Sequence, residues 1–423
     1  MLDALPIAAN LVMGTLAVFA GGSVAYLLTL LAAAKETVSP VGSVARRVCV
    51  VVPAHNEEPV VAATLRSLTA QNYPADLVRV VVIADNCTDA TASIARESGA
   101  IVWERTNTSE RGKGYALAWA FDRLETESDP SDFYVIVDAD TEAAPDFLAR
   151  IVARAASIGD RAAVQGRYRV LNSADGWRAA LMAAAFDLVN HVKPMGRERL
   201  GLSAGLKGNG MIFGRETLRV AKWRGDSITE DLDFGLDLLE FHGIRVAYAP
   251  DAVVRAQMPS GEVESRSQRD RWEQGRQEIV TRRAAKLFWR GVTTGDFRKV
   301  DAALDMVIPP LTELFALLAA WSLVCALDVS LGWASAWWFA PVVLAWLGFF
   351  VYVFGGLKKA GASPEAWGAI TQAPAYMVWK LVRYAVTTAK GVLYGKRNGG
   401  DEWVRTTRTP IVVTADKREE TAP

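Results

Sequence analysis

Hydrophobic residues concentrate near both ends of the chain, and a region of mixed composition lies between them. No charged residue occurs from Ala4 to Ala34, a run longer than the roughly 20 residues that a helix needs to cross about 30 Å of hydrocarbon. The run predicts a transmembrane helix within residues 1–36. A secretory signal peptide is the alternative, but the start lacks a positive charge, the run is too long, and basic residues follow it.

Two further apolar runs follow the mixed region. Met306–Leu327 is interrupted only by Glu313, and Leu331–Leu357 contains no charged residue. Their lengths predict two more transmembrane helices, within residues 304–358.

The distribution of basic residues predicts the orientation of these helices. The connector 328–331 contains no Lys or Arg, whereas basic residues lie before and after the pair of runs. They are Arg282, Arg283, Lys286, Arg290, Lys358 and Lys359. Because basic residues mark the cytosolic side, the mixed region is predicted to be cytosolic and the chain to be an integral protein of a bacterial inner membrane.

Shorter segments complete the predicted organisation. Residues 286–303 are expected to form an interfacial connector. In 363–396, an apolar stretch of about 14 residues is too short to span a bilayer and is followed by interleaved basic and apolar residues, which favours an amphipathic interfacial helix over a fourth crossing. Residues 397–423 are predicted to be a polar cytosolic tail.

The mixed region, 46–285, alternates between two kinds of periodicity. Continuous apolar runs predict buried strands at 48–54, 78–85, 100–104, 133–140 and 162–170. Apolar residues at helical spacing predict helices at 59–71, 90–98, 114–124 and 144–157. Repeated strand–helix units predict an α/β fold with a mainly parallel sheet and a ligand crevice at the carboxyl ends of its strands.

Composition and charge narrow the function. Lys plus Arg (47) equals Asp plus Glu (47), so the chain has no overall basic field of the kind that nucleic-acid binding requires. The three cysteines, Cys49, Cys87 and Cys325, are far apart and fit neither a disulfide framework nor a zinc motif. This usage suits a reducing compartment.

Polar residues follow each of the first two predicted strands. Pro53–Glu58 precedes a helix, where its acidic residues could simply favour the helix N-terminus. After the second strand, Thr88 or Asp89 could be an N-cap. Asp85 has no capping role and could accept hydrogen bonds from a base or a ribose.

The strongest short motif is Asp138-Ala-Asp140, directly after an apolar strand. Two carboxylates at positions i and i+2 of a strand face the same way, and burying both is costly without a cation or hydrogen-bond partners. Oxygen ligands suit Mg²⁺ or Mn²⁺, which also bridge to substrate phosphates.

Two later motifs carry groups that sugar transfer would need. In Thr229-Glu-Asp231, a carboxylate could act as general base on an acceptor hydroxyl. In Gln268-x-x-Arg271-Trp272, a guanidinium could stabilise a leaving diphosphate and an indole could stack on a sugar. A helix cap and a solvated Arg-rich helix are the alternatives.

Taken in order, these five signatures resemble the family-2 glycosyltransferases. The resemblance is greatest to the membrane-bound branch with the cellulose, chitin and hyaluronan synthases and the ceramide glucosyltransferases, and it covers about 48–276. It implies a Rossmann-like nucleotide-sugar transferase domain of the GT-A type, with transmembrane helices at both ends. It also implies a UDP-sugar donor, a lipid or glycan acceptor, Mg²⁺ or Mn²⁺, and inversion at the anomeric carbon.

The resemblance implies a role for each site residue. Asp231 corresponds to the catalytic base, and Asp140 to the metal ligand. The donor would be bound by Pro53, Ala54, His55, Glu57, Asp85, Lys113, Asp138 and Arg271. The acceptor would be bound by Gly208, Asn209, Gly210, Glu230, Gln268 and Trp272. Gly208–Gly210 could instead be a simple turn.

Near the end of the chain, Trp403, Thr406 and Arg408 are similar in pattern to the gating loop of cellulose synthases; an ordinary basic juxtamembrane tail is the alternative. Three crossings are few for a pore that exports a polymer, so transfer of one sugar to a lipid or lipid-linked acceptor is favoured over processive synthesis. The same residues are also compatible with two other functions, that of a sugar nucleotidyltransferase and that of a non-catalytic membrane scaffold.

Overall fold

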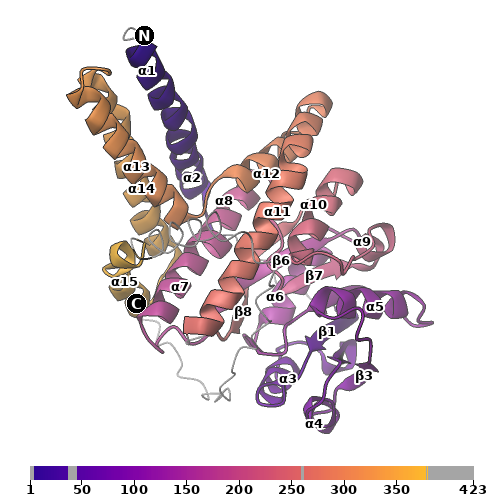
Figure 1. Ribbon diagram of the computed structural model, residues 1–423. Coiled ribbons are helices and arrows are strands. Elements are labelled where there is room, and N and C mark those ends of the chain that lie inside the picture. The colour runs from indigo at the N-terminus through magenta and orange to yellow at the C-terminus, as the bar shows by residue number, and fades with distance from the viewer. Residues whose placement is uncertain (1–3, 37–44, 259–261, 378, 380–423) are drawn as a thin grey trace, which may run out of the picture. The chain divides into compact units, whose positions relative to one another are not determined.

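The computed structural model describes residues 4–36, 45–258, 262–377 and 379, which fall into two compact units (Figure 1). The first unit holds the described residues of 1–36, 172–204 and those from 273 onward, and the second holds those of 45–171 and 205–272. The domain boundaries expected at 46 and 285 stay a prediction.

The second unit contains the sheet. Its strands are β1 (Val48–Ala54), β2 (Val78–Asp85), β3 (Ile101–Arg105), β4 (Phe133–Ile136), β5 (Thr141–Ala143), β6 (Ala163–Val170), β7 (Met211–Gly214) and β8 (Ala247–Ala256). Its helices are α3 (Val61–Thr69), the 3₁₀ turn η2 (Ala75–Leu77), α4 (Thr91–Glu97), α5 (Lys113–Glu125), α6 (Phe147–Ala156), α9 (Arg215–Val220) and α10 (Glu230–His242). The five predicted strands are confirmed, although β4 ends four residues before the predicted limit of 140.

The eight strands form one sheet in the order β3-β2-β1-β4-β7-β6-β8-β5. The first four strands in this order are mutually parallel, and β6 and β8 are also parallel. Strand β7 runs antiparallel to β4 and β6, and β5 runs antiparallel to β8. The mainly parallel α/β sheet is therefore confirmed, and the carboxyl ends of β1, β2, β3 and β4 meet at one edge.

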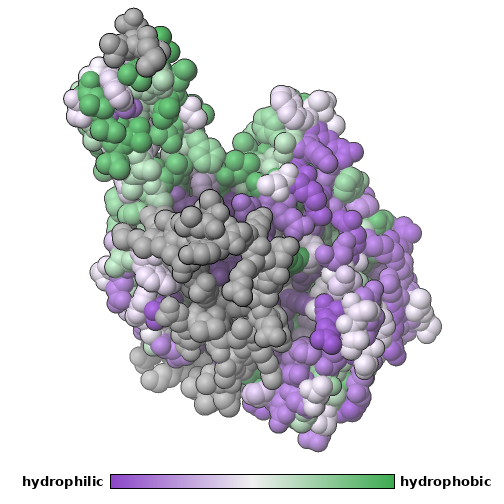
Figure 2. All heavy atoms as spheres, viewed as in Figure 1, coloured by the Kyte–Doolittle hydropathy of each residue, from purple (hydrophilic) through white to green (hydrophobic). Residues whose placement is uncertain are grey.

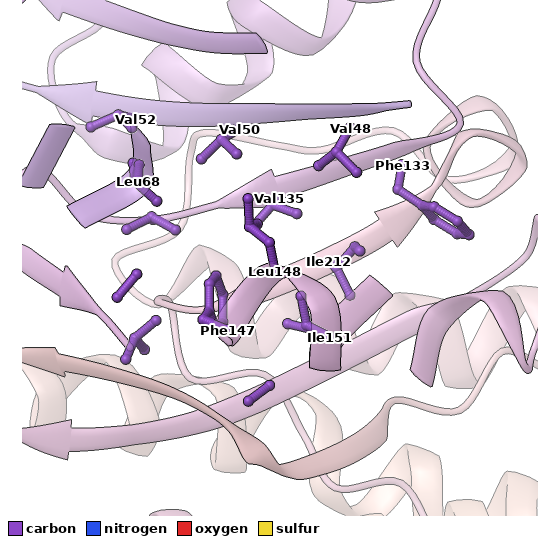
Figure 3. Close-up of a cluster of buried hydrophobic side chains, with 14 of the residues drawn as sticks. Val48, Val50, Val52, Leu68, Phe133, Val135, Phe147, Leu148, Ile151 and Ile212 are labelled. Atoms are coloured by element: carbon purple, nitrogen blue, oxygen red, sulfur yellow. The ribbon is translucent and has the colours of Figure 1, made fainter. Parts of the chain in front are cut away.

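Hydrophobic cores cover both faces of this sheet. Alternate residues of β1 face opposite ways: Val50 packs with side chains of α3 and α6 (Figure 3), whereas Val51 packs with side chains of α5 and α10. Because β1 and β4 are buried on both faces, their sequences are continuously apolar rather than alternating. Two helical layers thus hold the sheet rigidly, and its polar edge is left for ligands.

The first unit is helical. Its elements are α1 (Ala4–Leu16), the π-helical turn η1 (Ala17–Gly21), α2 (Gly22–Ala33), α7 (Trp177–Phe186), the π-helical turn η3 (Asp187–Val192), α8 (Lys193–Arg199), α12 (Phe297–Val307), α13 (Leu311–Ser330), the 3₁₀ turn η4 (Ala336–Trp338), α14 (Phe339–Ala360) and α15 (Pro364–Ile370). Helix α11 (Glu262–Thr294) begins in the second unit and continues in the first.

Three helical stretches among the described residues are long and apolar enough to cross a membrane: Leu5–Ala33, Leu311–Ser330 and Ala336–Ala360. Small residues let these helices approach their neighbours closely. A Cβ at Gly348 of α14 would lie 2.6 Å from Val24 of α2, and one at Gly196 of α8 would lie 2.3 Å from the backbone oxygen of Leu30.

Hydrogen bonds and ion pairs of charged side chains also hold the helices of this unit together. Lys359, near the end of α14, donates to the backbone oxygens of Leu31 (3.0 Å) and Ala34, at the end of α2, where helix carbonyls otherwise lack partners. A buried network joins α2 to two further helices: Arg197 of α8 binds Asp301 of α12 (Nε–Oδ2 3.1 Å), and Asp301 also accepts from the hydroxyl of Tyr26 in α2 (2.8 Å).

Candidate functional site

The loops that follow β1 and β2 interlock at the carboxyl edge of the sheet. Asn56, with a positive φ of 55°, accepts through Oδ1 from the backbone N–H of Thr88 (2.7 Å). Thr91 accepts from the N–H of Glu57 (2.8 Å), and Glu58 accepts from the N–H of Ala90 (3.1 Å). The backbone N–H of Glu57 and the carboxylate of Glu58 therefore bind the neighbouring loop.

In the loop after β2, Asp89 has the helix-capping role that the sequence analysis left open between Thr88 and Asp89. Its Oδ1 accepts from the backbone N–H of Thr91 (3.0 Å), the first residue of α4. Asp85, the last residue of β2, has a different partner, so Asp89 has a structural role and Asp85 stays a candidate for binding.

Asp85 lies at the end of β2 and is ion-paired with Arg105 at the end of β3. The Nη1–Oδ1 distance is 2.7 Å, and the side chains are only 5% and 6% exposed. Arg105 also binds Glu110, at 3.1 Å. Beside them, Nδ1 of His55 lies 2.7 Å from the backbone oxygen of Asp85; since that oxygen can only accept, Nδ1 donates.

Arg105 is a site residue that the sequence analysis missed. The predicted strand ended at residue 104, so Arg105 was not recognised as a strand-end residue. Its register partner in the parallel pair is Asp85, and that pairing is the signal that could have identified it.

Lys113 links several predicted site residues. Its ammonium is bound to the carboxylate of Asp138 and donates to the backbone oxygen of Gly208 (2.6 Å). A Cβ at Gly208, where φ is +80°, would lie 3.4 Å from Oδ2 of Asp231 and 3.8 Å from Nζ of Lys113. Residues from four separate parts of the chain thus converge around one backbone oxygen.

The cluster also brings two helix N-termini together. Lys113 begins α5, and Glu230 and Asp231 lie in the first turn of α10. A Cβ at Gly114 would lie 3.3 Å from the Cγ of Glu230, so the two first turns are neighbours. Thr229 makes no side-chain capping bond, but the carboxylates of Glu230 and Asp231 accept backbone hydrogen bonds within the first turn of α10, so the helix-cap alternative stays open.

Burial and mutual repulsion perturb the two carboxylates. Burial, followed by the charge of Asp231, raises the pKa of Glu230 to about 7. Burial also raises the pKa of Asp231, while the charge of Lys113 opposes the shift. For Lys113 itself burial acts to lower the pKa, but the surrounding carboxylates, Asp138 first, raise it. Titratable groups with such shifts are typical of functional sites.

Asn209 is fully buried beside the cluster and contacts its backbone. Its Oδ1 accepts from the backbone N–H of Asp138 (3.2 Å), and its Nδ2 donates to Thr141 (2.8 Å). The side chain of Gln165 donates to the backbone oxygen of Asn209 (2.8 Å). These contacts hold Asp138 in place, so the segment Gly208–Gly210 does more than close a turn.

Asp138 and Asp140 lie in the loop beyond β4 and not in the strand itself, because the N–H of Asp138 pairs with a side chain and not with a neighbouring strand. Asp140 is buried, and Thr141 donates to its Oδ1 at 3.5 Å. Among the described residues, no group of three or more His, Cys, Asp or Glu is arranged to hold a metal ion.

Two groups of the motif Gln268–Trp272, at the start of α11, lack partners. Oε1 of Gln268 and Nε of Arg271 are buried and make no hydrogen bond to any described residue. Burial lowers the pKa of Arg271, and Trp272 is 40% exposed. Polar atoms that are buried without partners suit ligand binding. That this motif lies close to Asp231 stays a prediction.

Two predicted donor residues lie at the end of β1, next to His55: Pro53 is part-buried and Ala54 is buried. The predicted gating residues Trp403, Thr406 and Arg408 lie outside the described residues, as do residues 380–396 of the predicted interfacial helix.

This arrangement places an ammonium and carboxylates side by side at two helix N-termini. Two helix N-termini and an ammonium favour anionic ligands such as a diphosphate. A carboxylate with a raised pKa next to them can accept a proton from a hydroxyl group. The site is therefore equipped for transfer chemistry on a phosphorylated substrate.

Comparison with known proteins adds independent findings. The model of the protein family described as "Glycosyltransferase like family 2" matches residues 45–275. A probable glycosyltransferase of Bacillus subtilis, YdaM, is 25% identical over 249 residues, which cover 57% of this chain and 58% of that protein. A beta-monoglucosyldiacylglycerol synthase of Synechocystis is 28% identical over 232 residues, covering 54% and 47%.

The chain spans about half the length of these curated relatives. Among solved structures, it is similar to the mannosyltransferase PcManGT of Pyrobaculum calidifontis in complex with GDP-Man and Mn²⁺. That match has 20% identity and a TM-score of 0.48, and it covers 88% of this chain and 99% of the other.

Proposed function

Because the chain belongs to the glycosyltransferase family 2, we propose that it transfers a sugar from a nucleotide diphosphate donor to a lipid or glycan acceptor. The observation that carries this proposal is the cluster around the backbone oxygen of Gly208, where Lys113 contacts Asp138 and lies beside Asp231. It combines a cation for a diphosphate with a carboxylate for an acceptor hydroxyl.

The donor's base and ribose are assigned to the rim formed by Pro53, Ala54, His55, Glu57 and Asp85. The backbone of Asp85 is fixed by His55, and its carboxylate by Arg105. A carboxylate bound to a buried guanidinium is fixed in position, which suits recognition of a base N–H. A UDP-sugar is the proposed donor.

The metal ion is assigned to Asp140, with Mg²⁺ or Mn²⁺ as the candidates. These ions take oxygen ligands and are commonly bound by one or two carboxylates together with substrate phosphates, so a single buried carboxylate fits a metal that arrives with the diphosphate. When bound, the ion would neutralise charge on the diphosphate. Asp138, already engaged by Lys113, is assigned to the donor.

Asp231 is assigned as the general base. Its raised pKa brings it nearer to neutral pH, where a base removes a hydroxyl proton most effectively. Lys113 and Arg271 would stabilise the negative charge on the departing diphosphate. Inversion at the anomeric carbon is proposed because the resemblance to the family-2 enzymes implies it.

The acceptor is assigned to the side of Gly208, Asn209, Gly210 and Glu230, with Gln268 and Trp272 from α11. A lipid or lipid-linked acceptor agrees with three helices that could cross a membrane and with a relative named as a glucosyldiacylglycerol synthase. A processive polysaccharide synthase is the second candidate. The transfer would take place at the cytosolic face of a bacterial inner membrane.

The decisive experiment incubates the purified protein with radiolabelled nucleotide sugars, Mn²⁺ and a lipid extract. We expect release of nucleoside diphosphate and label in the organic phase. Label in an insoluble polymer would instead identify a synthase. Pyrophosphate-dependent release of nucleoside triphosphate would identify a nucleotidyltransferase, and no turnover with any donor would favour a non-catalytic scaffold.

The metal assignment makes a separate prediction. Asp140→Ala should raise the Mn²⁺ concentration needed for nucleoside diphosphate binding, measured by calorimetry, because the protein's own metal ligand is lost. Asp160→Ala, at an exposed position, is the control. Equal Mn²⁺ dependence in both variants would remove Asp140 from the metal site.

A further inference from the structure

The loop 221–229 joins α9 to α10 and leads directly into Glu230 and Asp231. Figure 1 places α5, α9 and α10 in the same part of the second unit, and Figure 2 shows a mainly hydrophilic surface there. The loop nevertheless carries a tryptophan, Trp223, that is only 6% exposed. Its largest apolar side chain is therefore buried beneath this hydrophilic surface.

Trp223 packs against both helices whose first turns form the candidate site. The centroid of its ring lies 5.8 Å from that of Phe121 in α5 and 4.7 Å from that of Phe234 in α10. The ring of Phe213 in β7 lies 6.1 Å away, and all four rings belong to one hydrophobic core. Because a close-packed core leaves little free volume, the indole keeps α5 and α10 at a fixed separation.

Nearer the site, the loop and α5 touch through glycine. A Cβ at Gly225 would lie 2.5 Å from the backbone nitrogen of Tyr115 and 2.6 Å from its Cα, in the first turn of α5. A Cβ at Gly114 would lie 3.0 Å from the Cα of Gly225. Gly225 is not among the glycines with a positive φ, so the close approach of the backbones, and not an unusual conformation, requires a glycine there.

The helices that the loop separates carry the two groups assigned to opposite ends of the reaction. In sugar transfer, the acceptor oxygen bonds to the anomeric carbon while the bond from that carbon to the diphosphate breaks. Asp231 takes the hydroxyl proton, and the nucleoside diphosphate leaves with the bonding electrons beside Lys113. The separation of the carboxylate and the ammonium must therefore match the sugar that lies between them.

We propose that the loop 221–229 is a positioning element for this reaction, in which Gly225 and Trp223 set the separation between Lys113 and Asp231. This role rests on the proposed sugar transfer. The loop needs no contact with the substrate, because it acts through the two helices against which it packs.

The first experiment compares turnover and UDP binding in Gly225→Ala. To reach ordinary contact, the added Cβ must move from 2.5 Å to about 3.4 Å from a backbone nitrogen, which displaces the start of α10 from α5. A misplacement of about 1 Å lowers turnover by about 10²-fold. The dissociation constant of UDP should stay nearly native, because Lys113 is held by Asp138 and Gly208, outside the loop.

Two further variants grade and control this effect. Gly114→Ala, with its milder contact of 3.0 Å, should lose less turnover and serves if Gly225→Ala does not fold. Gly235→Ala adds the same methyl group to α10 at 3.4 Å from the side chain of Leu206, an ordinary contact, and should keep native turnover. Native turnover in Gly225→Ala, or an equal loss in Gly235→Ala, would overturn the proposal.

The pH profile of kcat/KM separates positioning from a simple loss of folded protein. The charges beside Asp231 are those of Lys113, Lys207 and the adjacent Glu230, and Lys113 acts to lower the pKa of Asp231. When the ammonium recedes in Gly225→Ala, that pKa should rise, so the acidic limb should move to higher pH. A lower rate with the native acidic limb would contradict positioning through Lys113.

The second experiment does not depend on turnover. Crystal structures of the native protein, Gly225→Ala and Gly235→Ala give the distance from Nζ of Lys113 to the carboxylate of Asp231. We expect a longer distance in Gly225→Ala and the native distance in Gly235→Ala. An unchanged distance in Gly225→Ala refutes the positioning role whatever the turnover. A longer distance in a protein that is inactive with every nucleotide sugar refutes only the sugar-transfer proposal.

Discussion

At the scale of single residues, the ammonium of Lys113 is the central cation of the candidate site. It contacts Asp138 and the backbone of Gly208, and its pKa is raised by three neighbouring carboxylates. Without this ammonium, buried negative charges would face one another without compensation, which is costly in a medium of low dielectric constant. A diphosphate can compete for the same cation, so donor binding and the ionisation of the carboxylates are coupled.

The assignment of Asp231 predicts a selective loss of chemistry. Asp231→Asn should lower turnover by about 10² to 10⁴ and leave the dissociation constant of the nucleoside diphosphate nearly unchanged, because only the base is lost. Asp237→Asn, on the same helix and paired with an exposed arginine, is the control. Turnover close to native in Asp231→Asn would exclude it as the base.

The perturbed pKa of Glu230 predicts how stability depends on pH. Because the folded-state pKa is raised from 4.5 to about 7, the folded protein binds more protons than the unfolded chain between these values. The resulting stability is fully present below pH 4.5 and is lost as the pH rises through about 7. In detergent, Glu230→Gln should therefore show a smaller decline in melting temperature between pH 5 and pH 8 than the native protein. Glu97→Gln, at an exposed position, should keep the native decline.

Individual site residues could be predicted where chemistry and position coincide in the sequence. Asp85, Asp138 and Asp231 follow apolar strands or open a helix, so their placement at one edge follows from the strand–helix alternation. Arg105 could not be identified this way, because an arginine at the end of a half-exposed strand looks like a surface residue. Only the register of β2 against β3 reveals that it is buried against Asp85.

At the scale of elements, five of the eight strands were predicted, whereas β5, β7 and β8 were missed and the helical unit was predicted only in its apolar spans. Strands β1 and β4 are continuously apolar because both of their faces are covered, and this pattern appears directly in the sequence. The segment 172–204 gives no comparable signal: it follows β6, yet α7 and α8 belong to the same unit as the apolar helices. That association depends on close backbone approach, which hydrophobic periodicity does not encode.

The contact between α2 and α8 predicts the effect of one methyl group. In Gly196→Ala, the added Cβ would lie 2.3 Å from the backbone oxygen of Leu30, so the helices must separate. We expect a loss of about 1–3 kcal/mol, seen as a lower melting temperature in detergent. Gly14→Ala, where nothing lies within 4 Å, should be neutral or slightly stabilising. Equal melting temperatures for the two variants would contradict the tight contact.

At the scale of the whole molecule, the three candidate spans and the basic residues predict a topology. The connector between α13 and α14 should face away from the cytosol and the sheet-containing unit should face it. In a Cys87→Ser background, Ala336→Cys should react with an impermeant maleimide in intact cells, whereas Ser93→Cys should react only after permeabilisation. Both positions are exposed. The reverse labelling pattern would invert the predicted orientation.

The bonds from Lys359 to the end of α2 have a consequence for biosynthesis. The oxygens of Leu31 and Ala34 leave the ribosome more than 300 residues before the ammonium that binds them. During most of translation the first span must therefore rely on water or on the insertion machinery at that end. The membrane unit can close only after residue 359 has been translated, so a nascent chain stalled before that residue would contain the sheet but lack this contact at the end of α2.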